Sequence, residues 1–197
     1  MPGTYTVTLA ERVNSAMTAV GDAQTFKVVE DGVQQMSAED KAALVAFQQK
    51  AARLQGAVAG ALDVANTTET RLDQIQKALD QTPAADPKLR DTARDLHHQL
   101  DDILVALRGD PVARQHEENT PPSISQRAGE VAGSGRMSTA RPTGTQVNNY
   151  QYASEQFAPV LAKLRSLVDV DLTNLEKALD TAGVPHTPGR IPAWKPE

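Results

Sequence analysis

Histidines come first among the residues that could carry chemistry, because their side chains bind metals and transfer protons near neutral pH. His97 and His98 are adjacent in a segment predicted to be helical, so they project about 100° apart and lack the i, i+4 spacing of a helical metal site. His116 precedes Glu117 and Glu118 in an irregular segment, where such a trio could hold a divalent cation weakly. Surface positions are the favoured interpretation for all three histidines. We therefore expect no metal and no cofactor.

Neighbouring acids raise the question of glycosidase chemistry. Asp101 and Asp102, like Asp169 and Asp171, lie close together along predicted helices. Glycosidases instead need two carboxyl groups that converge across a cleft, one of them with a pKa raised by burial. The chain also has no cysteine, no Gly-x-Ser-x-Gly elbow and no glycine-rich phosphate loop. We expect a non-catalytic segment.

A stretch in the C-terminal third carries the residue types of a contact surface. Arginine, amide and tyrosine side chains suit protein or carbohydrate contact because they combine hydrogen-bonding groups with apolar area. The candidates are Arg136, Arg141, Gln146, Asn148, Asn149, Tyr150 and Tyr152. The alternative is that Tyr150 belongs to the core and that the amides hold the backbone of the irregular segment before them.

Composition and charge exclude several classes of function. The net charge of −5 arises from acids and bases mixed along the chain without a basic block, so no nucleic acid partner is expected. Aromatic residues make up only 4% of the chain, which favours aliphatic helix packing over a deep ligand pocket. No apolar run approaches the roughly 18 residues of a membrane-spanning helix. The first residues also lack a signal-peptide pattern, so we expect any export signal to lie outside this chain.

The elements that must position these residues begin with two strands. Residues 4–9 alternate apolar and polar side chains, and residues 24–29 repeat this alternation after a turn-rich stretch. We expect them to form an antiparallel β-hairpin within residues 1–32. Because an isolated hairpin is marginally stable in water, this one needs a further sheet or a helix to lie against. We interpret it as the remnant of a sandwich domain.

The remaining pattern predicts a mainly α fold, a long antiparallel three-helix bundle that runs up, down and up over residues 33–183. Ser37 is a candidate N-cap for the first helix, with acids in the first turn. Apolar residues at steps of three and four continue from Leu44 to Leu79, which predicts a helix on the order of 60 Å long. Gly56 and Gly60 weaken its middle.

Two further helices complete the predicted bundle. One begins at Pro87, with Asp86 as its cap, and ends at Gly109. The other covers residues 147–179, where Pro159 should kink or divide it. Between them we expect an irregular insert over residues 109–142 with at most a short helix around residues 123–131. A proline-rich tail, residues 184–197, is expected to be extended and to dock Trp194 on the bundle.

Five features occur in a fixed order along nearly the whole chain. They are residues 2–9 (PGTYTVTL), residues 24–29 (QTFKVV), a helical hairpin, the segment 135–143, and a leucine-rich helix ending in Ala182-Gly183-Val184-Pro185. In this order they resemble the C-terminal region of bacterial sortilin-like, sialidase-type glycosyl hydrolases with BNR repeats.

The resemblance implies a non-catalytic accessory or interaction module at the C-terminus of a larger protein. In that family a β-propeller is held to carry the hydrolase-like function; no Asp-box of a propeller occurs here, so no catalytic residue carries over. The implied partner is the propeller domain of the parent chain or another protein, in the periplasm or outside the cell. The alternative is a carbohydrate-binding module that uses residues 148–152 to contact a glycan.

Overall fold

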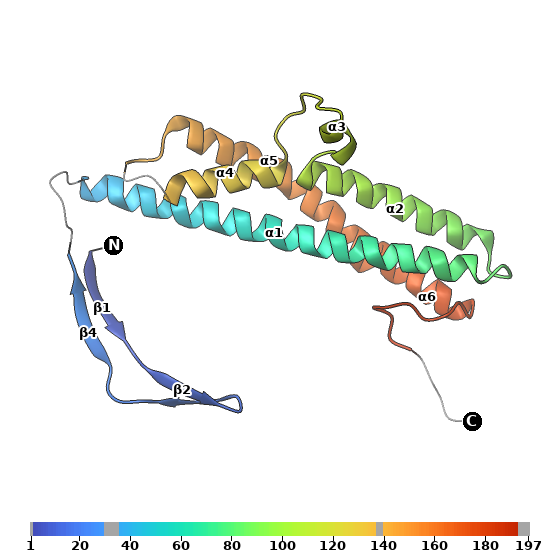
Figure 1. Ribbon diagram of the computed structural model, residues 1–197, viewed down its shortest axis with the longest axis horizontal. Coiled ribbons are helices and arrows are strands. Elements are labelled where there is room, and N and C mark those ends of the chain that lie inside the picture. Colours follow the sequence, from blue (N-terminus) through green and yellow to red (C-terminus); the bar gives the residue numbers. More distant parts are fainter. Residues whose placement is uncertain (1, 30–35, 137–139, 193–197) are drawn as a thin grey trace. The chain divides into compact units, whose positions relative to one another are not determined.

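The computed structural model describes residues 2–29, 36–136 and 140–192 (Figure 1). It is mainly helical, as the sequence predicts, and carries a β-hairpin at the N-terminus. The chain divides into two compact units, Met1–Ser37 and Ala38–Glu197, each of which is described by itself. The predicted boundary at residue 32 falls in a stretch outside the described residues.

The first unit is an antiparallel β-hairpin. Strand β1 (Gly3–Val7) pairs with β4 (Gln24–Val28), and this register places Tyr5 directly opposite Phe26. The pairing of the two predicted strands is therefore confirmed. Their residues alternate between two faces because side chains of a strand point to opposite sides in turn.

The stretch between these strands is more regular than we expected. Strands β2 (Ala10–Val13) and β3 (Ala16–Ala19) pair antiparallel and extend the hairpin. Asn14 and Ser15, which join them, have φ angles of 48° and 81°. Two consecutive residues with positive φ form the turn whose twist suits a two-residue hairpin loop, and asparagine tolerates this conformation well.

The second unit is built on α1 (Ala38–Asp80), an unbroken helix of 43 residues that spans about 65 Å. Glu39 and Asp40 place negative charge in its first turn, where the helix dipole favours it. Gly56 and Gly60 do not interrupt the helix. Both are exposed, and a Cβ added at either position would meet no neighbouring atom within 4 Å, so they lie away from the packed face.

Helix α2 (Pro87–Arg108) begins and ends where the sequence predicts. The Asp86 side chain caps it by accepting a hydrogen bond of 2.9 Å from the backbone N–H of Lys88. Gly109 ends it with a φ of 85° and donates its N–H to the carbonyl of Val105. The helix packs on the C-terminal half of α1, where both contribute to one core.

The N-terminal half of α1 is covered by α4 (Ile124–Arg136), which packs against it and against α5. Here the prediction of an irregular insert needs correction, because α4 is longer than the short helix expected and α3 (Pro111–Gln115) precedes it. Val131 and Ala132 form a small core with α1, and Gln48 Nε2 donates to the carbonyl of Gly135 at 2.7 Å. Tertiary packing therefore supports a glycine-rich helix of low intrinsic propensity.

The last helices follow one another without a gap: α5 (Gly144–Ser166), the π-helical segment η1 (Leu167–Leu172) and α6 (Thr173–Thr181). Pro159 lies inside α5 and does not divide it. The irregularity comes later, at η1, where the buried residues Leu167 and Leu172 are five positions apart. A π-helical turn bonds residue i to i+5, so it keeps both leucines on the buried face.

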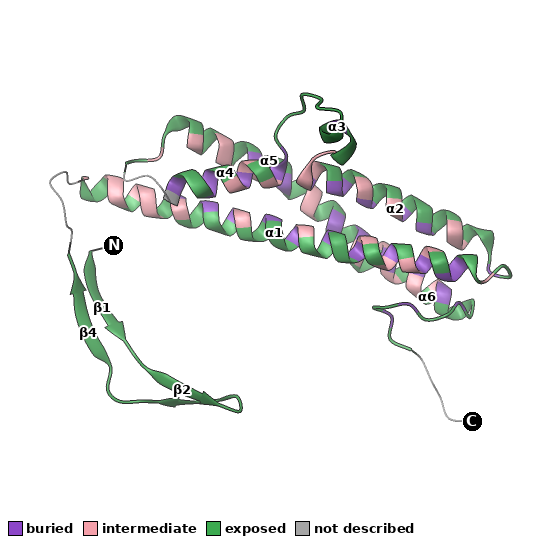
Figure 2. Ribbon diagram, in the orientation of Figure 1, coloured by how far each residue is buried: buried purple, intermediate pink, exposed green. Residues whose placement is uncertain are grey.

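The core consists almost entirely of aliphatic side chains from α1, α2 and the C-terminal helices. Figure 2 shows the buried positions along the facing sides of these helices, whereas the described strand residues are all exposed. The largest fully buried side chains include Leu72, Ile75, Leu79, Leu100, Leu104, Leu107, Leu167, Leu172 and Leu179. This composition agrees with the expected aliphatic packing.

The segment after α6 folds back on the helices. Val184 is buried with the core, and the Arg190 side chain, 2% exposed, pairs with Asp180 and donates to the carbonyl of Pro185 at 2.9 Å. The expectation of an extended tail therefore does not describe residues 184–190. Trp194, which we expected to dock on the bundle, lies outside the described residues.

The helical unit has its own core, so we expect it to fold without the hairpin. Deletion of residues 1–36 should leave the helical circular dichroism and the cooperative thermal melt largely unchanged, because burial of the helical seams contributes roughly 25 cal/mol per Å² of apolar surface. Loss of cooperativity in the truncated chain would show instead that the helices depend on the strands.

A substitution at Gly189 tests whether the segment after α6 packs closely on α1. Its φ is 94°, and a Cβ at this position would lie 2.8 Å from Arg71 Nε, whose guanidinium is paired with Glu176. Gly189→Ala should therefore lower the free energy of unfolding by about 2–3 kcal/mol in chemical denaturation. The matched control is Gly183→Ala, which has a φ of 66° but no atom within 4 Å and should cost only about 1 kcal/mol. Equal losses would contradict the close approach to Arg71.

Candidate interaction surfaces

The β1–β4 hairpin has one apolar and one polar face. Side chains of directly paired residues lie on the same face of an antiparallel ribbon. The polar face carries three threonines and a lysine: Thr4, Thr6, Thr25 and Lys27. The opposite face carries Tyr5, Val7, Phe26 and Val28 together with Gln24, and the Tyr5 and Phe26 rings stack with their centroids 5.9 Å apart.

This apolar face is open to solvent. Phe26 is 52% exposed and Val7 53%, while Tyr5 and Val28 are exposed to 40% and 37%. Among the described residues of the first unit, neither a helix nor a second sheet covers it. Contiguous exposed apolar side chains mark contact sites on soluble proteins, and a two-stranded ribbon has little stability of its own. The face therefore has the residue types and exposure that are common in contact surfaces.

The predicted contact residues on α5 divide into two groups. Gln146 belongs to a capping box with Thr143, and Tyr150 is half-buried with its ring edge-on to Phe47 at 6.1 Å. Asn148 and Tyr152 face solvent, Tyr152 with 55% exposure. Because Tyr150 and Tyr152 are two positions apart, they point about 200° away from each other. They do not form one stacking platform for a sugar ring.

The other predicted contact residues are spread over the end of α4, the segment before α5 and α5 itself. Arg141 is exposed and its Nη1 lies 3.6 Å from Asp40 Oδ1 on α1. Asn149 is half-buried on α5. Arg136 is the last residue of α4, and its side chain falls outside the part of the chain that the structure describes.

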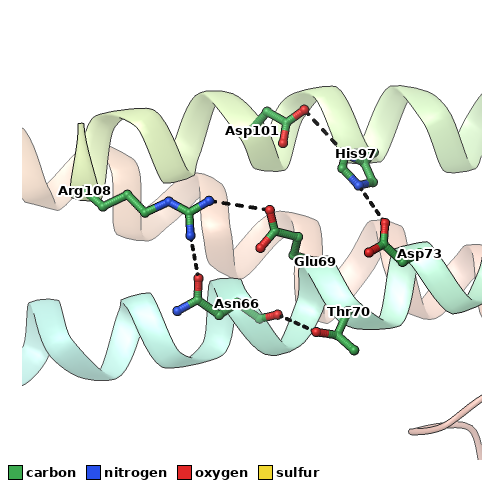
Figure 3. A network of polar contacts seen from close by, with 7 residues as sticks. All are labelled: Asn66, Glu69, Thr70, Asp73, His97, Asp101 and Arg108. Carbon is green, nitrogen blue, oxygen red and sulfur yellow. Dashed lines mark hydrogen bonds and ion pairs between the residues drawn. The ribbon is translucent and has the colours of Figure 1, made fainter. Parts of the chain in front are cut away.

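His97 holds a position that sequence reasoning missed. Figure 3 shows it between two carboxylates: its Nε2 lies 3.1 Å from Asp73 Oδ1 on α1, and its Nδ1 lies 3.4 Å from Asp101 Oδ2 one turn along α2. Partial burial lowers the pKa of His97, but the hydrogen bonds and negative charges of Asp73 and Asp101 together outweigh it, so its pKa is raised above the ordinary value. The histidine links α1 to α2.

Arg108 makes a second polar link between the same helices. Its guanidinium donates to Asn66 Oδ1 at 3.0 Å and lies 3.5 Å from Glu69 Oε1 (Figure 3). The side chains of His97 and Arg108 on α2 are thus paired with polar side chains of α1. The available signals were the i, i+4 spacing of His97 and Asp101 and the polar cluster around Asn66.

Within residues 2–29, 36–136 and 140–192, no group of three or more His, Asp or Glu side chains is placed to hold a metal ion. His116 and Glu117 are exposed at the end of α3, where Glu117 has a φ of 55°. None of the described helices combines the length and apolar character needed to cross a bilayer.

Comparison with known proteins finds no matching family model, no similar curated protein and no similar solved structure. The resemblance to sialidase-type hydrolases therefore rests on the order of sequence features alone.

The raised pKa of His97 predicts a pH-dependent contribution to stability. Protonated His97 is favoured in the folded state, so its stabilising effect is fully present below the unfolded pKa of about 6.5 and is lost as pH rises through the folded pKa. His97→Gln should reduce the free energy of unfolding more at pH 6 than at pH 8.5. We expect the two reductions to differ by less than about 1 kcal/mol, because His97 and its two carboxylate partners are accessible to solvent.

Urea denaturation at both pH values measures this difference. His98→Gln is the matched control, since this exposed neighbour has no carboxylate partner among the described residues. A loss in His97→Gln that is equal at the two pH values, or larger at pH 8.5, would show that His97 contributes without its charge.

Proposed function

We propose that this chain is a non-catalytic interaction module that docks the apolar face of the β1–β4 hairpin on a protein partner. The observation that carries the proposal is the exposure of Tyr5, Val7, Phe26 and Val28 on one face of a ribbon whose other face is polar. Aromatic side chains at the centre of such a face are typical anchors of protein interfaces. A partner sheet or helix would supply the second layer that a two-stranded ribbon needs.

The resemblance described above supports a particular class of partner. It points to a larger exported protein with a β-propeller, to which this chain would add a C-terminal accessory region. In this proposal the hairpin completes a β-sandwich and the module acts in the periplasm or outside the cell. The partner is the propeller-bearing polypeptide or a protein bound to it.

The helical unit has a supporting role in this proposal. We interpret it as an antiparallel bundle in which α1 runs up, α2 and α4 in succession run down, and α5 to α6 run up again. The core along α1 and the two polar links from α2 make this support stiff. Its outer helical faces remain available for assembly.

The carbohydrate-binding alternative has weaker support. Tyr150 packs on Phe47, so Tyr152 is the tyrosine of this stretch that offers an open ring. One exposed ring with Asn148 nearby gives less stacking area than the two-ring surface that the sequence predicted. An oligosaccharide panel therefore serves as a second arm of the test.

The deciding experiment is a calorimetric titration of the full chain against a purified propeller-bearing protein of the resembled family. Wild-type chain should bind, and Tyr5→Ser with Phe26→Ser should weaken binding by at least about 30-fold, the loss expected when aromatic anchors are removed. Thr6→Ser with Thr25→Ser changes the polar face of the same ribbon and should leave affinity unaltered. Helical circular dichroism confirms that both variants retain the second unit.

Two results would contradict the proposal. Absence of binding by the wild-type chain removes the proposed partner class, and equal affinity of both double variants removes the hairpin from the interface. Saturable binding of an oligosaccharide that disappears in Tyr152→Ala would instead favour the carbohydrate-binding function.

A further inference from the structure

A compact pocket opens at the N-terminal end of the helical unit, between α1 and the start of α5. Its volume is about 280 Å³. Phe47 and Lys50 line it from α1, and Arg141, Pro142, Val147 and Tyr150 line it from the other side, with two alanines of α1 completing the wall. Arg141 and Tyr150 were both candidates for contact from the sequence, and the structure brings them to the same pocket.

The walls of the pocket are apolar and well supported. Phe47 is buried to 8% exposure, and the edge-on contact with Phe47 holds the Tyr150 ring in place. Behind them Ala51, Val131 and Ala132 form the small core between α1 and α4. The volume lies just below the range of pockets for drug-sized ligands, so it suits one aromatic ring or a branched alkyl group.

The charge of the lining is positive. Lys50 and Arg141 contribute two cations, and no carboxylate is among the lining residues. Asp40 lies 3.6 Å from Arg141 and offsets part of its charge, whereas Lys50 has no ion-pair partner within the residues that the structure describes. An apolar pocket with cationic side chains at its edge is suited to a ligand with an anionic end.

From this geometry we infer that the pocket binds a carboxylate attached to a compact apolar group. The apolar group lies against the Phe47 and Tyr150 rings that line the pocket, and the carboxylate faces Lys50 and Arg141. Two sources share this chemistry, a free organic acid and the C-terminal residue of a peptide. The inference concerns the helical unit alone and does not depend on docking by the hairpin, so either can fail without the other.

The test is a titration of the ¹⁵N-labelled full chain followed by NMR. The probes are 3-phenylpropionate and the peptide Gly-Gly-Phe, each compared with its neutral amide, 3-phenylpropanamide and C-terminally amidated Gly-Gly-Phe. We expect saturable shifts of the Phe47, Lys50 and Tyr150 amides with at least one acid and weaker binding of its amide. The acid that binds more tightly identifies the source, a free acid or a peptide end.

Substitutions separate this site from non-specific binding. Lys50→Gln should weaken binding of the acid by up to about fivefold, the range for an accessible ion pair, and leave the affinity for the amide unchanged. Arg53→Gln removes an exposed cation one turn further along α1, outside the pocket lining, and is the matched control. Ala43→Leu should fill the pocket and abolish binding while circular dichroism shows an intact fold.

Three results would overturn the inference. The first is the absence of saturable shifts for both acids up to about 10 mM, near the weak end of measurable affinities. The second is equal binding of acid and amide, which would remove the role of the cations. The third is an equal effect of Lys50→Gln and Arg53→Gln, which would indicate attraction to the overall charge rather than to this pocket.

Discussion

Burial of the apolar stripe along α1 is the constraint on which the rest of the helical unit depends. The helix has 43 residues, and its buried positions extend from Phe47 near one end to Leu79 at the other. Helix α2 has 22 residues and covers only part of this length. If nothing covered the remainder, Phe47 and Ala51 would face water, so a second helix must follow α2 along the same side. Helix α4 fills this position, although its glycines make it a weak helix by itself.

The same constraint accounts for the irregular C-terminal helix. Buried residues in a regular helix recur at steps of three and four, and those from Leu172 to Leu179 follow that rule. The step of five from Leu167 to Leu172 would rotate one leucine away from the core in an α-helix. A π-helical turn absorbs the additional residue. A local departure from regular hydrogen bonding therefore preserves continuous contact with α1 and α2.

Local signals in the sequence predicted the elements that have strong caps or a clear alternation of apolar and polar residues. They did not predict elements whose stability depends on packing against distant parts of the chain. Asp86-Pro87 and Gly109 define both ends of α2, and alternation defines the pairing of β1 with β4. In α4 the few apolar residues are interspersed with glycines, so its stability comes from packing on α1 and α5, which a local pattern does not show. His97 looked like a surface residue because Asp73, its partner on α1, is distant in sequence.

For the contact residues, the sequence grouped Tyr150 with Tyr152, but helical geometry separates them, since Tyr150 packs on Phe47.

The two units differ in how much of their apolar surface they bury, and this difference supports the proposed interaction role of the hairpin. In the helical unit, large aliphatic side chains are buried and the polar bridges from α2 to α1 join charged groups to each other. In the hairpin, alternation produces an apolar face as well, yet the Tyr5 and Phe26 rings that stack on it remain 40% and 52% exposed. Stacking of two rings contributes about 0.5–1.5 kcal/mol beyond area burial, far less than ordering a strand pair costs. A ribbon with this pattern has little stability of its own, and this supports the proposal that the hairpin docks on a partner.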